Sequence, residues 1–219
     1  MPYDPRPSLE HATRWWWIRH APVPLHRHEI YGSRDVDCDT SDAAAFAALA
    51  ADLPPDAVWY VSHLRRTRQT AQAIGGQGYD LPELISTPEI GEQDFGELHG
   101  RRHVEEEARR DDPFVGFWPA SPLADIPGGE KFDDLCRRIR GFVEARNARH
   151  AGRDVVCVAH AGPILAALRL ALNLDAASTV AFYVSPLSVT RIHHYASVPE
   201  GGPRYRVFSV ATPTNGRNG

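Results

Sequence analysis

The chain has 219 residues, of which 42% are hydrophobic and 24% charged, so it is long enough for one globular domain with a sizeable core. A formal net charge of -4 and the lack of any run of roughly 18 apolar residues argue against a nucleic-acid partner and against a membrane-spanning protein. The three cysteines, Cys38, Cys136 and Cys157, form no C-x-x-C pair and fit reduced thiols in the cytoplasm.

The first expected strand, residues 14–19, is aromatic and ends before Pro22 and Pro24. Because side chains alternate along a strand, Trp15 and Trp17 should face one side of the sheet and Trp16 the other. We expect all three tryptophans to fill core.

Expected strands and helices alternate along the rest of the chain, which is typical of an α/β fold with three layers (α/β/α) and a largely parallel central sheet. The long helix carries an apolar stripe, and DVVCVA is the nearly continuous apolar run of a strand covered on both faces. The last three strand-like runs could pair at the sheet edge. The expected elements are a helix over 39–52 capped by Thr40 or Ser41, a strand over 57–61, a helix over 64–74, a charged helix over 101–110, a long helix over 131–150, a strand over 154–159, a helix over 163–174, and strand-like runs over 179–184, 188–194 and 205–211.

The segment over 96–129 has a weaker pattern and holds the charged helix and a loop rich in proline and aromatic residues. It predicts either a lid-like insertion beside a site or a plain surface excursion. Phe114, Phe117 and Trp118 could form an apolar wall for a nucleotide or a benzimidazole-like group, or could only tether this loop. The expected domain organisation is a flexible N-terminus over 1–13, a single domain over 14–212 with the lid-like insertion at 97–129, and a flexible tail over 213–219.

Polar side chains gather directly after three of the expected strands. In open α/β sheets, ligands bind beyond the carboxyl ends of the strands. Arginine side chains and a helix N-terminus suit phosphate oxygens, so a phosphoryl group is the best fit. Histidine can be the nucleophile in phosphoryl transfer, and a proton donor for the leaving oxygen is then required. The side chains are Arg19 and His20, then Ser62, His63, Arg65 and Arg66, and finally His160, which an Ala-Gly turn and a helix follow.

The stretch PEIGEQDFGELHG, residues 88–100, supplies candidates for that donor. Glu92 is the preferred one, with Glu89 and Asp94 as alternatives. A carboxylic acid can donate near neutral pH when burial and a bound phosphate raise its pKa.

In this arrangement the chain resembles the histidine phosphatase superfamily, also called the phosphoglycerate mutase-like family. The resemblance covers roughly residues 14–192 and rests on ordered recurrence at matching strand ends. The five motifs are Arg19-His20-Ala21, SHLRRTRQTA at 62–71, EQDFGELHG at 92–100, PGGE at 127–130 and VCVAHAG at 156–162.

The resemblance implies a metal-independent phosphomonoesterase that acts on a small phosphorylated metabolite, with no cofactor. His20 would form a phosphohistidine, and Glu92 would protonate the leaving group and then take a proton from water. Arg19, Arg66 and His160 would hold the phosphoryl oxygens, and His160 is also counted among the catalytic residues.

The chain departs from the family pattern after His20. Many relatives continue with Glu-Thr and then an asparagine near the phosphate, where this chain has Pro22, Val23 and His26. This difference leaves rate and substrate open. The stretch YGSRD, residues 31–35, resembles one in bacterial alpha-ribazole phosphatases. Candidate substrate-binding residues are His26, His63 and Tyr31, although His63 could be a plain loop residue.

Two other functions stay open. A phosphoglycerate-type mutase would share the chemistry, but GRRHVEEEARR at 100–110 lacks the longer insertion associated with such mutases. A non-catalytic phosphate-binding or regulatory module would explain the altered loop but has no need of a proton donor. Histidines 26, 28, 193 and 194 are interpreted as solvated or strand-edge residues, and no metal site is expected. The sequence does not indicate an oligomeric state.

Overall fold

One mixed sheet of six strands, in the order β3-β2-β4-β1-β5-β6, forms the centre of the computed structural model, which describes residues 11–26, 28–103, 113–114 and 116–213. The four strands β3, β2, β4 and β1 run parallel, while β5 pairs antiparallel with both β1 and β6. The strands are β1 (Ala12–Arg19), β2 (Val58–Ser62), β3 (Leu84–Thr87), β4 (Asp154–Ala159), β5 (Val189–Tyr195) and β6 (Tyr205–Thr212).

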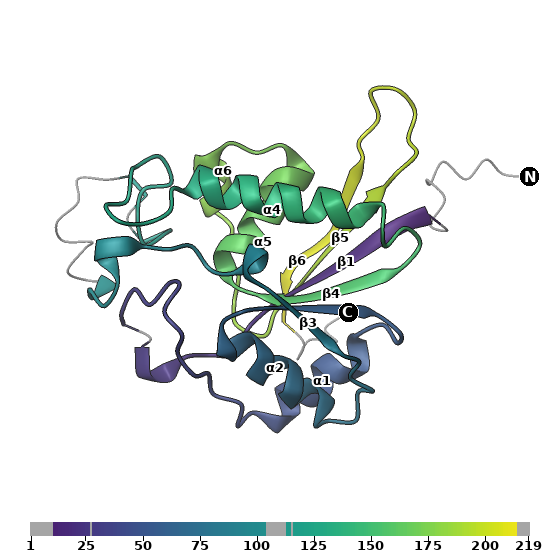
Figure 1. Cartoon of the computed structure of the whole chain (residues 1–219), viewed down its shortest axis with the longest axis horizontal. Helices are drawn as coiled ribbons and strands as arrows, with labels where there is room; N and C mark the ends of the chain where they lie inside the picture. Colours follow the sequence, from purple (N-terminus) through teal and green to yellow (C-terminus); the bar gives the residue numbers. More distant parts are fainter. Residues whose placement is uncertain (1–10, 27, 104–112, 115, 214–219) are drawn as a thin grey trace, which may run out of the picture.

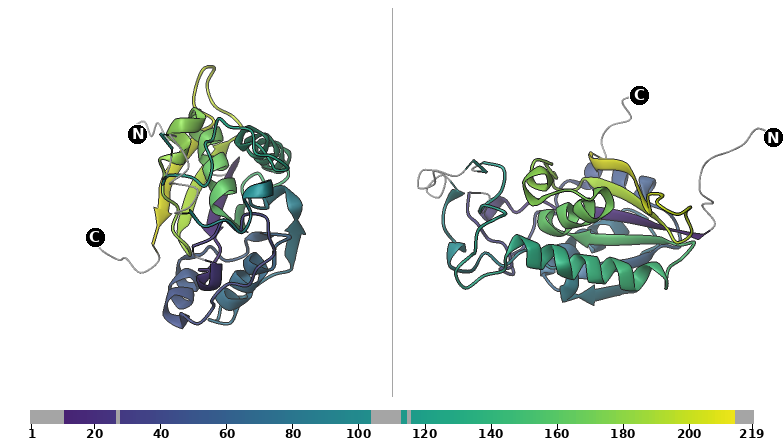
Figure 2. Two further views of the ribbon diagram at one scale, coloured as in Figure 1. Left: turned by 90° about the vertical axis from the view of Figure 1, so that its left-hand side faces the viewer. Right: turned by 90° about the horizontal axis from the view of Figure 1, so that it is seen from above.

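Helices cover both faces of this sheet. α1 and α2 lie on one face, and α4, α5 and α6 lie on the other (Figures 1 and 2). The expected three-layer α/β architecture is therefore confirmed. The helices are α1 (Ala43–Asp52), α2 (Arg65–Gly75), α4 (Phe132–Asn147), α5 (Ala161–Leu172) and α6 (Ala176–Val180), with single 3₁₀ turns at Pro24–His26, Pro88–Ile90 and Gly96–Leu98.

The three tryptophans of β1 divide between the two cores as expected from strand alternation. Trp15 and Trp17 pack with Phe142 of α4, at ring-centroid distances of 5.8 and 6.2 Å. Trp16 faces the other core, which includes Phe46 and Leu49 of α1. Because β1 is buried on both faces, it is a rigid element. It therefore holds the residue that directly follows it in a fixed position.

Several expected boundaries are wrong for local reasons. β1 begins at Ala12, so the last two residues of the flexible N-terminus expected over 1–13 belong to the sheet. Thr13 donates its hydroxyl to the Asn147 carbonyl at 2.9 Å, and α4 ends at Asn147 instead of at residue 150. α1 begins at Ala43, because Asp42, and not Thr40 or Ser41, accepts a hydrogen bond from the Ala45 amide.

The strand expected over 179–184 is also wrong, because α6 occupies the first part of it. Asp175 caps this helix by accepting from the Ser178 amide at 2.7 Å, and the cap outweighs the β-branched residues that suggested a strand. The edge strand β3 was not expected. Most of the charged helix expected over 101–110 and nearly all of the tail expected over 213–219 lie outside the described residues.

Within the described ranges, none of the helices has the length and apolar character needed to cross a membrane.

We predict that His193 of β5 makes the stability of the fold depend on pH. This side chain is buried, neither ring nitrogen has a hydrogen-bond partner among the described residues, and its ring centroid lies 4.1 Å from that of Phe208. Burial, aided by Arg191 and Arg14, lowers the pKa of His193 from 6.5 to about 4. The unfolded chain therefore takes up this proton first, and the free energy of unfolding falls between pH 6.5 and 4 by up to about 3 kcal/mol.

Denaturant titrations across this pH range should show a steeper loss of stability in the native protein than in His193→Leu. Parallel pH dependences of the two proteins would contradict this account.

Candidate active site

The parallel pairing of β1 with β4 brings two histidines together. In this register Arg19, the last residue of β1, lies opposite Ala159, the last residue of β4. His20 and His160 follow these residues, and the His20 amide donates to the Ala159 carbonyl at 3.0 Å. The two imidazole rings lie 5.1 Å apart between centroids. Two histidines separated by 140 positions in the chain therefore form one site at the carboxyl edge of the sheet.

His20 is held as a neutral imidazole with one free nitrogen. Its Nδ1 lies 2.6 Å from the Ala21 carbonyl oxygen, which can only accept, so Nδ1 carries the proton. Nε2 is then left with its lone pair. Burial, together with the charges of Arg66 and Arg19, lowers the pKa of His20 well below its ordinary value. This imidazole is suited to act as a nucleophile.

His160 has the opposite tautomer. The Nε of Arg66 donates to Nδ1 of His160 at 3.2 Å, and because a guanidinium cannot accept, Nδ1 is unprotonated. Nε2 therefore carries the proton and donates to Ser62 Oγ at 2.8 Å. Burial, with Arg66 and His20, lowers the pKa of His160 well below its ordinary value.

Arg66, at the start of α2, is fully buried and holds the loop that follows residue 30. It donates to the carbonyls of Gly32 and Arg34, each at 2.7 Å, and its guanidinium lies 5.2 Å from the centroid of the Tyr31 ring. Three contacts of one side chain thus fix this loop beside His160.

Arg19 lies at the edge of the same site, and not all of its N–H donors are used by described residues. Its Nη1 donates to the Val184 carbonyl at 2.5 Å, while its Nε atom is buried and has no hydrogen-bond partner in the described part of the chain. The described residues include no ion-pair partner for Arg19 or for Arg66. Arg66 is buried and Arg19 is half-buried, and two such guanidinium groups without an ion-pair partner among the described residues favour an anion at this position.

Glu92 reaches the site from the turn that follows β3. Its Oε1 accepts from the amide of Gly162, at the start of α5, at 3.1 Å and from the Gln93 amide at 3.0 Å. A Cβ on residue 162 would lie 2.3 Å from this oxygen, so only glycine permits the contact. Burial of the carboxyl raises the pKa of Glu92 despite the nearby charges of Arg66 and Arg19.

The two alternative acids point to other partners. Glu89 forms an ion pair with Arg146 at 2.5 Å. Asp94 accepts from the Gly96 amide at 2.8 Å and is half-exposed beside His99. Of the three candidates, Glu92 is the one in contact with the helix that begins after His160.

A pocket of about 370 Å³ opens beside the two histidines, with their chain neighbours Arg19 and Ala161 in its wall. His20, Arg66 and His160 do not line it and are buried, with 1% or less of each residue exposed. Among the expected substrate residues, Tyr31 lines the pocket. His26 contacts Glu29 at 3.2 Å, His63 is exposed beside Gly91, and neither lines the pocket. The pocket is lined by Arg19, Pro22, Val23, Pro24, Glu29, Ile30, Tyr31, Gly32, Glu92, Phe95, His103, Trp118, Pro119, Ala161 and Pro186.

The aromatic residues of the lid-like segment have different surroundings. Trp118 lines the pocket and donates to Gln93 Oε1 at 2.9 Å. Phe114 packs against the core on the α4 side, and Phe117 is exposed. The expected apolar wall therefore consists of Trp118 alone among these three.

Sequence reasoning missed Arg138 of α4, which holds the acidic turn, that is, the stretch over 88–100 that carries Glu92. Its guanidinium donates to the carbonyls of Glu89 at 2.7 Å and Glu92 at 3.3 Å. The same side chain forms a two-pronged ion pair with Glu130 at 2.7 and 2.9 Å. Nothing in the local pattern of α4 signals this role. The contacts of Ser62 with His160 and of Gly162 with Glu92 were also not predicted, although both residues lie in the quoted motifs.

Two glycines let the acidic turn pack against the PGGE stretch. Gly96 has a φ of +49°, and a Cβ there would lie 2.2 Å from the Pro127 carbonyl oxygen. Gly129 is similarly close to the Asp94 carbonyl, at 2.6 Å for a Cβ. The motifs at 92–100 and 127–130 are therefore two sides of one support for Glu92.

In the described part of the chain, no group of three or more His, Cys, Asp or Glu side chains is placed to hold a metal ion.

Comparisons with known proteins agree with this geometry. The model of the histidine phosphatase superfamily (branch 1) matches residues 15–201. A metal-independent phosphoserine phosphatase of Arabidopsis thaliana is 32% identical over 108 residues, which cover 49% of this chain and 45% of that protein. The adenosylcobalamin/alpha-ribazole phosphatase of Salmonella typhimurium is 28% identical over 176 residues, 78% of this chain and 85% of that one.

Among solved structures, a mycobacterial glucosyl-3-phosphoglycerate phosphatase superposes with a TM-score of 0.75 at 23% identity. The match covers 92% of this chain and 99% of that structure, and it shows the shared fold. The chain spans about half the length of the first curated relatives that it matches.

Proposed function

Because the chain belongs to the histidine phosphatase superfamily (branch 1), we propose that it is a metal-independent phosphomonoesterase that works through a phosphohistidine at His20. One observation carries the proposal. The neutral imidazole of His20 lies 5.1 Å from that of His160, beside two arginines that have no ion-pair partner among the described residues. This set combines a nucleophile with an anion-binding site.

His20 is the proposed nucleophile. Its Nδ1 proton is held by the Ala21 carbonyl, so the Nε2 lone pair attacks phosphorus. The P–N bond forms as the bond from phosphorus to the ester oxygen breaks. The lowered pKa of His20 keeps the imidazole unprotonated before the attack.

Arg19, Arg66 and His160 are the proposed phosphoryl clamp. The buried and unpaired Nε of Arg19 would gain an acceptor when a phosphoryl oxygen binds. Each terminal nitrogen of Arg66 carries two hydrogens. One of them donates to the loop, at the Arg34 or the Gly32 carbonyl, and the other remains to donate to a phosphoryl oxygen. His160 holds Arg66 in place for this contact, because its Nδ1 accepts from the Nε of Arg66 at 3.2 Å.

Glu92 is the proposed acid and base. Its raised pKa favours the protonated carboxyl, which gives its proton to the departing oxygen. The resulting carboxylate then takes a proton from the water that attacks the phosphohistidine. Phosphate leaves, and His20 and Glu92 return to their starting states.

A small phosphorylated metabolite is the proposed substrate, and alpha-ribazole phosphate is the first one to test. Two likenesses support it, the YGSRD stretch and the Salmonella typhimurium relative, whose name includes this substrate. The cysteines Cys38, Cys136 and Cys157 are unpaired, which supports work in a reducing compartment such as the cytoplasm.

Release of p-nitrophenol from p-nitrophenyl phosphate, with and without EDTA, tests the proposed function. We expect EDTA-resistant turnover in the native protein and a loss of at least about 1,000-fold in His20→Ala, because the nucleophile is removed. His28→Ala is the matched control, since His28 is exposed and does not line the pocket. Full turnover by His20→Ala would overturn the mechanism.

We also predict that Arg138 is a positioning residue for the acid. Replacing it as Arg138→Gln frees the turn that carries Glu92, and it should lower kcat by about 10- to 100-fold for alkyl phosphates. The loss should be several-fold smaller for p-nitrophenyl phosphate, because that leaving group needs little protonation.

Arg137→Gln is the control for Arg138→Gln. It changes the neighbouring residue of α4, which is exposed and pairs with Asp134. Equal losses of kcat on alkyl phosphates and on p-nitrophenyl phosphate would contradict this prediction. They would show that Arg138 stabilises the fold and does not position Glu92 as the proton donor.

A further inference from the structure

The pocket beside the two histidines has an unequal distribution of charge along its wall. Among its described lining residues, Arg19 is the one guanidinium or ammonium group, and it lies beside His20 and Arg66. Two carboxylic acids, Glu92 and Glu29, line the same pocket. Glu92 has a part in the proposed reaction, whereas Glu29 has none. Glu29 therefore needs a separate explanation.

Glu29 is fixed in place by the chain around it. It forms an isolated antiparallel bridge with Arg102, and the next residue, Ile30, donates its amide to the Arg101 carbonyl at 3.0 Å. Its carboxylate accepts the contact from His26 Nδ1 at 3.2 Å. Arg102 shares this bridge but does not line the pocket.

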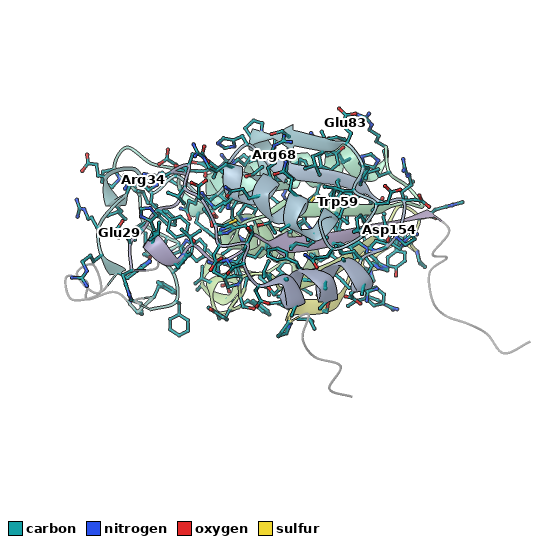
Figure 3. The ribbon with its side chains drawn as sticks, turned by 90° about the horizontal axis from the view of Figure 1, so that it is seen from below. Glu29, Arg34, Trp59, Arg68, Glu83 and Asp154 are labelled. Atoms are coloured by element: carbon teal, nitrogen blue, oxygen red, sulfur yellow. The ribbon has the colours of Figure 1, made fainter. Side chains whose placement is uncertain are left out.

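Figure 3 shows Glu29 at the same end of the molecule as Arg34, with Asp154 at the opposite end. Asp154 is the first residue of β4, so Glu29 lies toward the carboxyl edge of the sheet, where the candidate site is.

The remaining wall of the pocket is mostly apolar. It presents proline, aliphatic and aromatic side chains, together with the imidazole of His103. A carboxylate or second phosphate on the leaving group would lose water here and would meet the negative charge of Glu29, while Arg19 at the phosphoryl position is the one arginine or lysine among the described lining residues. A neutral hydroxyl or N–H group could instead donate to Glu29. The apolar side chains include Val23, Ile30, Phe95, Trp118, Pro119 and Pro186.

We propose that Glu29 is a specificity-determining residue that selects phosphate monoesters with uncharged, largely apolar leaving groups and rejects those with carboxylates. This inference rests on the proposed function, because it places the phosphoryl group at Arg19 and Arg66. It assigns the leaving group of the substrate to the class of neutral, ring-bearing alcohols. The phosphate esters of amino acids and of sugar acids carry a carboxylate and belong to the rejected class.

A pair of aryl esters that differ in one charge tests the proposal. Phenyl phosphate and 3-carboxyphenyl phosphate have similar size and leaving groups of similar acidity. We expect the native protein to prefer phenyl phosphate in kcat/KM by at least about 10-fold. Glu29→Gln should reduce this preference by about 3- to 10-fold, mainly through a lower KM for the carboxylated ester.

Two controls separate the charge effect from loss of fold and from a general change in net charge. Glu29→Gln should unfold at the same denaturant concentration as the native protein, which shows that the variant is folded. Glu144→Gln also removes one negative charge. Glu144 lies on the exposed part of α4, three residues before Asn147, and Asn147 contacts the start of β1. This variant should leave the preference unchanged.

The outcomes distinguish the two proposals. If the native protein hydrolyses neither ester, the proposed function fails and the specificity proposal fails with it. If it hydrolyses both esters equally well, or if Glu29→Gln keeps the native preference, the specificity proposal alone is overturned.

Discussion

The pairing of β1 with β4 is the interaction on which the site depends. Their parallel register ends with Arg19 opposite Ala159, so the next residue of each strand, His20 and His160, must be neighbours. A slip of the register by one residue would turn every side chain of β1 to the other face of the sheet. The two cores prevent such a slip, because Trp16 fits one of them and its two tryptophan neighbours fit the other.

The second constraint is the burial of charge around these histidines. Burial, together with the charges of Arg66 and Arg19, lowers the pKa of both imidazoles and favours their neutral forms. Arg66, which is fully buried with no ion-pair partner among the described residues, is itself costly to bury. Arg66 offsets part of this cost through the carbonyls of Gly32 and Arg34. A bound phosphoryl group would offset more of it. In the proposed mechanism, the same electrostatic field prepares the nucleophile and attracts the substrate.

The sequence allowed the central features to be predicted because they depend on local patterns. The apolar run of β4, the alternating tryptophans of β1 and the polar residues after each strand are all visible in short windows. β3 is not visible, since it is a four-residue edge strand whose Ile85 is exposed. α6 was missed because the Asp175 cap prevailed over β-branched residues. The contacts of Arg138 and Gly162 with Glu92 join distant segments, so only the fold reveals them.

Direct detection of the covalent intermediate tests the central claim, which is that His20 carries the phosphoryl group. The Glu92→Gln variant can be mixed with p-nitrophenyl phosphate, whose leaving group needs little acid, and quenched in alkali, in which phosphohistidine survives. Mass spectrometry of the intact chain and its peptides then locates the modification. The account predicts one phosphoryl group on His20 and none in a variant that also carries His20→Ala. Hydrolysis with no phosphorylated chain, or a phosphoryl group on another residue, would contradict it.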